Sequence, residues 1–160
     1  MDSSAEPPGL LDALRATPIR FRAASANRSP GELQKGETAG AWSANEILWH
    51  IRAAADVYGE HIARILDEDT PSWRHVSPRA RMKKVQYNQI PFAESLAAFE
   101  RQRSALVTRL DALPIAAWKR FAIVRVEKRE RKLTLQERIW GMVTHEAVHC
   151  EQVEALLPRQ

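Results

Sequence analysis

Two capping boxes fix where two long helices begin in this chain. In Ser43-Ala44-Asn45-Glu46 and in Thr134-Leu135-Gln136-Glu137, a hydroxyl and a carboxylate can each accept a hydrogen bond from a backbone N–H that a helix start leaves without a partner. Apolar residues then recur at spacings of three or four, which is the pattern of a helix with one buried face. The sequence therefore predicts one long helix from about residue 43 to residue 66 and another from about residue 134 to residue 158.

Two further helices are predicted from the same periodicity. The first runs from about Leu10 to Ala26, with an interruption at Thr17-Pro18, where proline can open a new helical turn with the threonine as its cap. The other opens at Pro91 and runs to about Leu113. The connection from about Asp67 to Ile90 is longer than neighbouring antiparallel helices in a bundle need, so we expect it to be a crossover.

A short β-hairpin is expected before the last helix. Residues 121–126 and 132–134 contain β-branched side chains, and a charged turn separates them. The basic cluster from Arg125 to Lys132 has no aromatic or glycine-rich companion, and the 24 basic and 20 acidic residues of the chain are largely interspersed. We interpret the cluster as a solvated hairpin tip and expect no nucleic-acid partner.

Length and composition indicate one domain. A chain of 160 residues can bury a core without disulfides, and we assign residues 9–158 to a single domain that follows a short disordered tail, residues 1–8. Cys150 is the sole cysteine, so no intrachain disulfide can form and a reducing, cytoplasmic setting is expected. No segment approaches the roughly 18 apolar residues of a membrane span, so no membrane partner is expected.

The last helix carries a candidate metal site. His145 and His149 are one turn apart on one helix face, close enough for two imidazoles to bind one transition metal. Glu146 and His149 also interrupt a stripe that is otherwise apolar, and burying such groups without partners is costly. A bound metal would compensate for that cost, whereas the alternative is a set of core side chains satisfied by hydrogen bonds.

A third ligand must come from elsewhere in the chain. His145-Glu146-x-x-His149 fits the zinc-protease pattern, in which the glutamate is the general base, but those enzymes take their third ligand from downstream. Here only 11 residues follow His149, so the best candidate is His50 in the second predicted helix. His61 lies about 16 Å farther along that helix and cannot reach the same ion. Cys150 is interpreted as a small buried thiol.

Two motifs resemble a known family. Trp42-Ser43-Ala44-Asn45-Glu46-Ile47-Leu48-Trp49-His50 is similar to the W-S-x-x-E-h-h-x-H signature that opens the second helix of DinB/YfiT-like proteins. His145-x-x-x-His149-x-x-Gln152 is similar to the H-x-x-x-H-x-x-Q motif of the same family. With the long connection and the hairpin, the resemblance spans about residues 10–157.

The resemblance implies an all-α four-helix bundle of up-down-down-up type that acts as a homodimer. It also implies that His50, His145 and His149 hold one divalent metal ion, zinc or nickel. Some members of the family are S-transferases or isomerases that use a low-molecular-weight thiol such as bacillithiol, mycothiol or glutathione. The expected partners are therefore a small-molecule thiol and an electrophile.

Three functions follow from these expectations. The first is a metal-dependent thiol S-transferase of the detoxification type, because a cation lowers the pKa of a bound thiol or water. The second is a metal-dependent hydrolase that uses metal-bound water. The third is a non-catalytic stress or binding protein that the metal stabilises.

Three further side chains have candidate roles. Glu146 is a candidate catalytic residue, as proton acceptor or as a group that orients a ligand histidine, and the alternative is a buried carboxylate that only accepts hydrogen bonds. Arg103 interrupts the stripe of the third helix and is a candidate to bind a carboxylate of the substrate or thiol, or else a snorkelling side chain. Gln152 is expected to orient a ligand or to face solvent.

Overall fold

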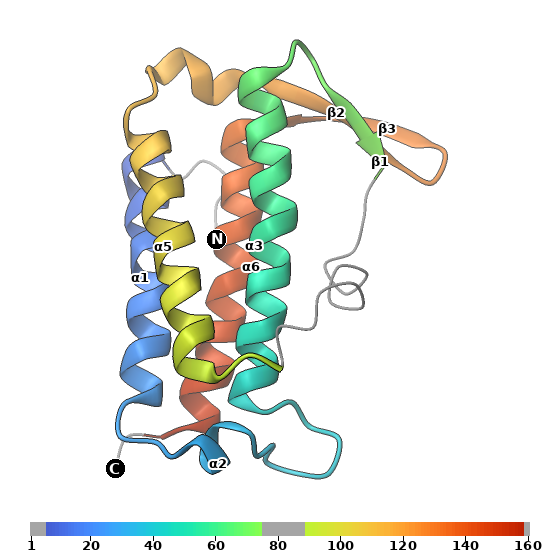
Figure 1. Ribbon diagram of the computed structural model, residues 1–160. Helices are drawn as coiled ribbons and strands as arrows, with labels where there is room; N and C mark the ends of the chain where they lie inside the picture. The colour runs from blue at the N-terminus through green and yellow to red at the C-terminus, as the bar shows by residue number, and fades with distance from the viewer. Residues whose placement is uncertain (1–5, 75–88, 159–160) are drawn as a thin grey trace.

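Four long helices lie side by side in the computed structural model, which describes residues 6–74 and 89–158 (Figure 1). The described helices are α1 (Pro7–Ser25), α2 (Pro30–Leu33), α3 (Ala44–Asp67), α5 (Phe92–Asp111), the 3-10 helix η2 (Ile115–Lys119) and α6 (Leu135–Leu156). The strands are β1 (Ser72–Arg74), β2 (Phe121–Val126) and β3 (Arg129–Thr134). The predicted helical bundle is thus confirmed as mostly helical with four long helices.

Both predicted capping boxes are formed. Ser43 Oγ accepts a hydrogen bond from the N–H of Glu46 at 3.3 Å, and the Glu46 carboxylate accepts one from the N–H of Ser43 at 2.8 Å. Thr134 and Glu137 make the same reciprocal pair at the start of α6, with distances of 3.2 and 2.7 Å. These local bonds explain why the starts of α3 and α6 could be located from sequence alone.

The first helix differs from the expectation in two ways. α1 is continuous from Pro7 to Ser25, and Pro18 lies inside it. Thr17 is therefore not a cap. A proline in a helix interior costs a backbone hydrogen bond, but buried Leu14 and Phe21 on either side of it anchor the helix in the core. The helix also begins at Pro7, inside the predicted tail, because proline is well suited to the first turn. Residues 1–5 lie outside the described part of the chain.

The sheet is larger than the predicted hairpin. β2 and β3 pair antiparallel as expected, but β1 adds a third strand that pairs with β2 in parallel, with Trp73 opposite Val124. Three residues are too few to show the alternation of a strand, so only pairing with β2 identifies β1. The predicted crossover falls mainly on residues 75–88, outside the described residues, and together with the up-down-down-up order it stays a prediction.

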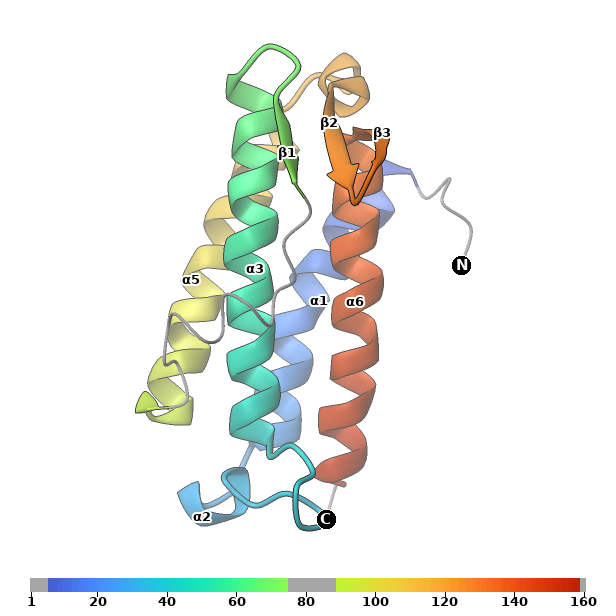
Figure 2. The same ribbon diagram turned by 90° about the vertical axis from the view of Figure 1, so that its right-hand side faces the viewer.

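The core lies between the four long helices. α3 and α6 are neighbours on the face shown in Figure 2, with α1 and α5 behind them and the sheet at one end. Phe21 of α1 and Phe99 of α5 meet edge to face with ring centroids 6.5 Å apart.

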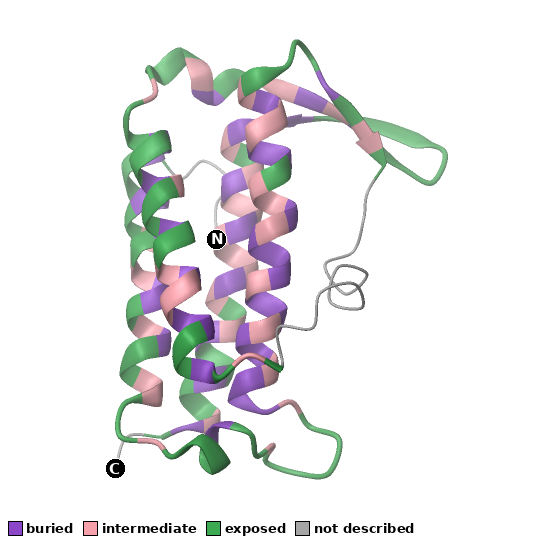
Figure 3. Ribbon diagram, in the orientation of Figure 1, coloured by how far each residue is buried: buried purple, intermediate pink, exposed green. Residues whose placement is uncertain are grey.

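Exposed residues cover the tip of the hairpin, as predicted for its basic cluster (Figure 3). Among the described helices, no segment combines the length and the apolar character that crossing a lipid bilayer demands.

A buried ion pair ties three of the helices together. Arg103 of α5 donates a hydrogen bond to Glu146 Oε1 of α6, and Thr17 of α1 donates one to Glu146 Oε2 at 2.9 Å. Both charged side chains are almost fully buried, with 3% of the arginine and 1% of the glutamate exposed. Burial raises the pKa of Glu146, and the guanidinium and the Thr17 hydroxyl act in the opposite direction. Because arginine stays protonated in proteins, the carboxylate is its counter-ion.

We expect Arg103→Met alone to lower the free energy of unfolding by about 3–5 kcal/mol, because it leaves a buried carboxylate without its cation. The double variant Arg103→Met/Glu146→Leu should recover most of that loss, because it removes both charges and keeps the volume apolar. Urea denaturation followed by circular dichroism measures both. Arg101→Met, at an exposed position of the same helix, is the control and should change stability by less than about 0.5 kcal/mol. If the double variant is no more stable than Arg103→Met, the loss of stability in the single variant does not come from the unpaired carboxylate of Glu146.

Candidate metal centre

Three histidines from two helices converge beside the core. His50 comes from α3, and His145 and His149 come from α6. One ring nitrogen from each of the three lies within 4.8 Å of the others, and the Nε2 atoms of His50 and His145 are 2.9 Å apart. The three pairs of ring centroids are 4.6 to 4.9 Å apart. The sequence prediction that these side chains meet is therefore correct, and their role as metal ligands is taken up below.

Helix geometry explains the convergence. His145 and His149 are one turn apart on α6, so both imidazoles project from the same side of the helix. His50 lies two turns into α3, whose start is fixed by the Ser43 capping box. α3 and α6 pack side by side (Figure 2), so the histidine face of one meets the histidine of the other.

Two aromatic rings flank the three histidines. Trp42, directly before the N-cap of α3, stacks on His149 with centroids 6.2 Å apart and planes 19° apart, and its ring lies 5.1 Å from that of His50. Tyr58, two turns after His50 on α3, has its ring 6.1 Å from that of His145. Gln152 Oε1 lies 3.0 Å from His149 Nδ1. A proton on Nδ1 donated to that oxygen leaves the Nε2 lone pair of His149 for a ligand bond.

The electrostatics keep two of the histidines neutral. Burial, followed by the unfavourable effect of His149 and Arg138 on a second positive charge, lowers the pKa of His145 to about 4. Burial also lowers the pKa of His149, although Gln152 acts in the opposite direction. Neutral imidazole is the form that binds metals, so protons compete weakly with a cation at neutral pH.

The donor set fits a transition-metal ion. Three imidazoles suit zinc, nickel or copper. Two nitrogens each about 2.1 Å from one ion are at most about 4.2 Å apart, so nitrogens that lie within 4.8 Å of one another need only a small ring adjustment to share an ion. The described group contains no carboxylate or thiolate beside the three histidines. Three ligands leave at least one coordination position open, which is the arrangement of catalytic sites and not of closed structural ones.

The other predicted site residues lie elsewhere. Glu146 is adjacent to His145 in sequence, but both its oxygens face Arg103 and Thr17, which matches the alternative of a buried carboxylate that accepts hydrogen bonds. Arg103 is paired with Glu146 and almost fully buried, and its role in binding a carboxylate of the substrate or thiol stays a prediction. Cys150 is a buried free thiol, as expected, and Gln152 contacts His149.

Sequence reasoning gave no role to three side chains near the site: Trp42, Tyr58 and Arg138. Trp42 stands in the family-like motif, and an aromatic residue directly before a capping box is the signal that it packs at the helix start. Arg138 precedes His145 by two turns, a spacing that places both on nearly the same face of α6. Tyr58 carries no signal of its own, because aromatic residues on an apolar stripe are ordinary core residues.

In the metal-free protein we expect His145 to make stability depend on pH. An unfolded histidine has a pKa of about 6.5, and that of folded His145 is about 4, so the unfolded chain holds more protons between these values. Acidification from pH 6.5 to about 4 should therefore lower the free energy of unfolding, with no further effect of this group above pH 6.5. Urea titrations of the wild type and of His145→Gln measure the difference. If the wild type and His145→Gln lose stability equally on acidification, the pKa of His145 in the folded protein is not lowered.

Comparisons with known proteins agree with this fold. The chain is similar in structure to YfiT from Bacillus subtilis, described as a probable metal-dependent hydrolase with an unusual four-helix bundle topology. The TM-score is 0.76 at 19% sequence identity, over 98% of this chain and 88% of YfiT, and the likeness is thus one of fold. None of the curated proteins matches. The model of the DinB superfamily matches residues 13–153, and the chain therefore belongs to the DinB superfamily.

Proposed function

We propose that this protein is a metal-dependent enzyme in which His50, His145 and His149 hold one divalent ion, zinc or nickel. The observation that carries the proposal is the convergence of three imidazoles, two of them held neutral, with no other protein ligand in the described group. When bound, a divalent cation would lower the pKa of a coordinated thiol or water and supply a nucleophile near neutral pH. Trp42 and Gln152 would hold the imidazoles in place.

Thiol-dependent transfer is the reaction we favour. Glu146, the obvious candidate base, is engaged by Arg103 and Thr17. Burial raises the pKa of Cys150 to about 12, so its thiol stays protonated and is a poor nucleophile. A low-molecular-weight thiol brings its own ionisable group and needs no base from the protein. These observations support a transferase that joins such a thiol to an electrophile.

Hydrolysis is the second candidate. It is supported by the similarity to YfiT, which is described as a probable metal-dependent hydrolase. A hydrolase would turn over an ester or amide without any added thiol, so the two reactions can be distinguished in one assay.

We expect the wild-type protein to contain or bind about one zinc or nickel ion per chain, and His50→Ala and His145→Ala to lose it. Each variant removes one of three ligands, and two imidazoles hold a divalent ion poorly. Inductively coupled plasma mass spectrometry and titration of metal-free protein measure the stoichiometry. His61→Gln, which changes a buried histidine outside the group, should keep the ion. Wild-type protein that fails to bind added zinc and nickel would exclude the centre.

The metal-loaded protein should consume an electrophile such as a chlorinated dinitrobenzene in a thiol-dependent way. We expect His50→Ala to lower this rate at least about a hundredfold, since the cation leaves with its ligand. The assay compares bacillithiol, mycothiol, glutathione and no thiol, with nitrophenyl esters as hydrolytic substrates. Turnover of esters without thiol would favour the hydrolase. A loss of stability on chelation without turnover of either substrate set would indicate a metal with a structural role alone.

A further inference from the structure

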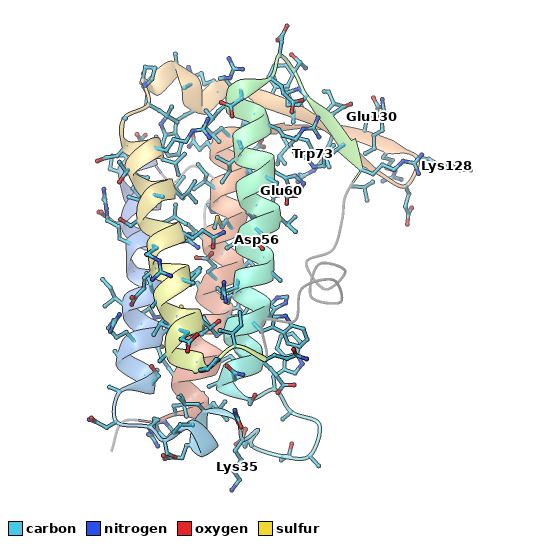
Figure 4. The ribbon with its side chains drawn as sticks, in the orientation of Figure 1. Lys35, Asp56, Glu60, Trp73, Lys128 and Glu130 are labelled. Atoms are coloured by element: carbon cyan, nitrogen blue, oxygen red, sulfur yellow. The ribbon has the colours of Figure 1, made fainter. Side chains whose placement is uncertain are left out.

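A second cluster of side chains adjoins the three histidines. Trp73 of β1 stacks on His61 of α3, with ring centroids 4.3 Å and planes 11° apart. Arg138 of α6 places Nη1 3.4 Å from His61 Nδ1, and its guanidinium lies over the Tyr58 ring at 4.1 Å. The Tyr58 ring in turn lies 6.1 Å from that of His145. Side chains therefore run in contact from the sheet to the histidines, and Figure 4 shows Trp73 between the sheet and α3.

This cluster holds nitrogen atoms that lack partners. Arg138 Nε and Trp73 Nε1 are buried and have no hydrogen-bond partner within the described residues, and the same holds for His145 Nδ1 at the other end of the row. Buried donors without acceptors are costly, and folded proteins avoid them. Arg138 Nε and Trp73 Nε1 are therefore two N–H donors in one row of contacting side chains for which no described residue supplies an acceptor.

The cluster also carries a positive charge without a counter-ion. Arg138 is largely buried, and the groups within the described residues that act on its pKa besides burial are the Tyr58 hydroxyl, which is neutral, and Arg131, with no carboxylate among them. The contrast is Arg103 on α5, which is buried against Glu146. Residues 75–88, which the structure does not describe, contain no aspartate or glutamate in their sequence. A guanidinium that is largely withdrawn from water is normally paired with an anion, and no described residue supplies one to Arg138.

We propose that Arg138 and Trp73 bind the carboxylate of a substrate whose other end reaches the three-histidine centre. This inference rests on the proposed function and names the class of molecule that the centre acts on. A guanidinium binds a carboxylate through two parallel N–H donors, and Arg138 Nε is one donor that remains to be used. Trp73 Nε1 supplies a third, neutral donor. One positive charge matches a carboxylate better than a phosphate dianion.

The spacing sets the size of the ligand. Arg138 and His145 are two turns apart on α6, which is ~10 Å along the helix axis. A molecule with its reactive group at the histidines and its carboxylate at Arg138 must therefore be an extended one of about that length. Tyr58 lies between the two ends and offers an apolar ring surface to its middle.

Matched thiols test the inference in the cobalt-loaded protein, whose visible absorption reports a ligand that joins the metal. 6-Mercaptohexanoate and 6-mercaptohexanol differ only in the carboxylate. We expect the acid to bind about tenfold or more tightly than the alcohol in the wild type, because it alone can pair with Arg138. Arg138→Gln should reduce this ratio to about one, and Arg138→Lys should restore part of it. Arg131→Gln, which removes a charge at an exposed position close by, should leave the ratio unchanged.

A wild-type ratio near one, or a ratio that survives in Arg138→Gln, would overturn the inference. Circular dichroism establishes whether Arg138→Gln folds. If it does not fold, the affinity ratio in Arg138→Lys and the ¹H–¹⁵N spectra of the wild type test whether Arg138 binds the carboxylate. A wild type that binds no metal would remove the proposed function but not this site. For that case, ¹H–¹⁵N spectra of metal-free protein follow the Trp73 indole and Arg138 Nε–H signals during titration with hexanoate and with hexanol. Saturable shifts with hexanoate alone support the anion site, and equal or absent shifts reject it.

Discussion

The buried Arg103–Glu146 pair is the constraint on which the rest of the structure depends. A carboxylate at the centre of a bundle needs a cation and a hydrogen-bond donor, and these come from α5 and α1. Meeting that requirement fixes the rotation of α6 about its own axis. Successive residues on a helix differ by about 100° in direction, so when Glu146 faces α1 and α5, His145 is turned away from them and meets His50 on α3. The Arg103–Glu146 pair, although costly to bury, therefore also sets the direction in which His145 projects from α6.

The two faces of α6 consequently have different chemistry. One face completes the core with Ile139, Met142 and Val153 and holds the ion pair. The other faces α3 and carries His145, His149 and Arg138, with Tyr58 of α3 packed against two of them. Metal binding and the proposed anion binding would share this second face. A cation centre at one end and a guanidinium at the other suit an extended, negatively charged substrate.

Arg103 and Arg138 illustrate what a sequence pattern can and cannot decide. Both are arginines on helices that bury one face, and the interruption of an apolar stripe singled out Arg103 as a candidate to bind an anion. The interruption was real, because Arg103 is buried, but its anion is Glu146 of the same chain. Arg138 gave no such signal and yet has no carboxylate beside it within the described residues. Which arginine is paired depends on contacts between helices, and these are not encoded in the spacing along any one of them.

The sequence by itself determined the local features of this protein. Capping boxes located the starts of α3 and α6, the charged turn located the β2–β3 hairpin, and one-turn spacing placed His145 and His149 on one face. Hydrogen bonds within a few residues and helical periodicity are sufficient for these features. Tertiary structure decided the rest. α1 is continuous through Pro18, β1 pairs with β2 as a third strand, and Glu146 pairs with Arg103. Each of those outcomes depends on packing between segments far apart in the chain, where burial outweighs local preference.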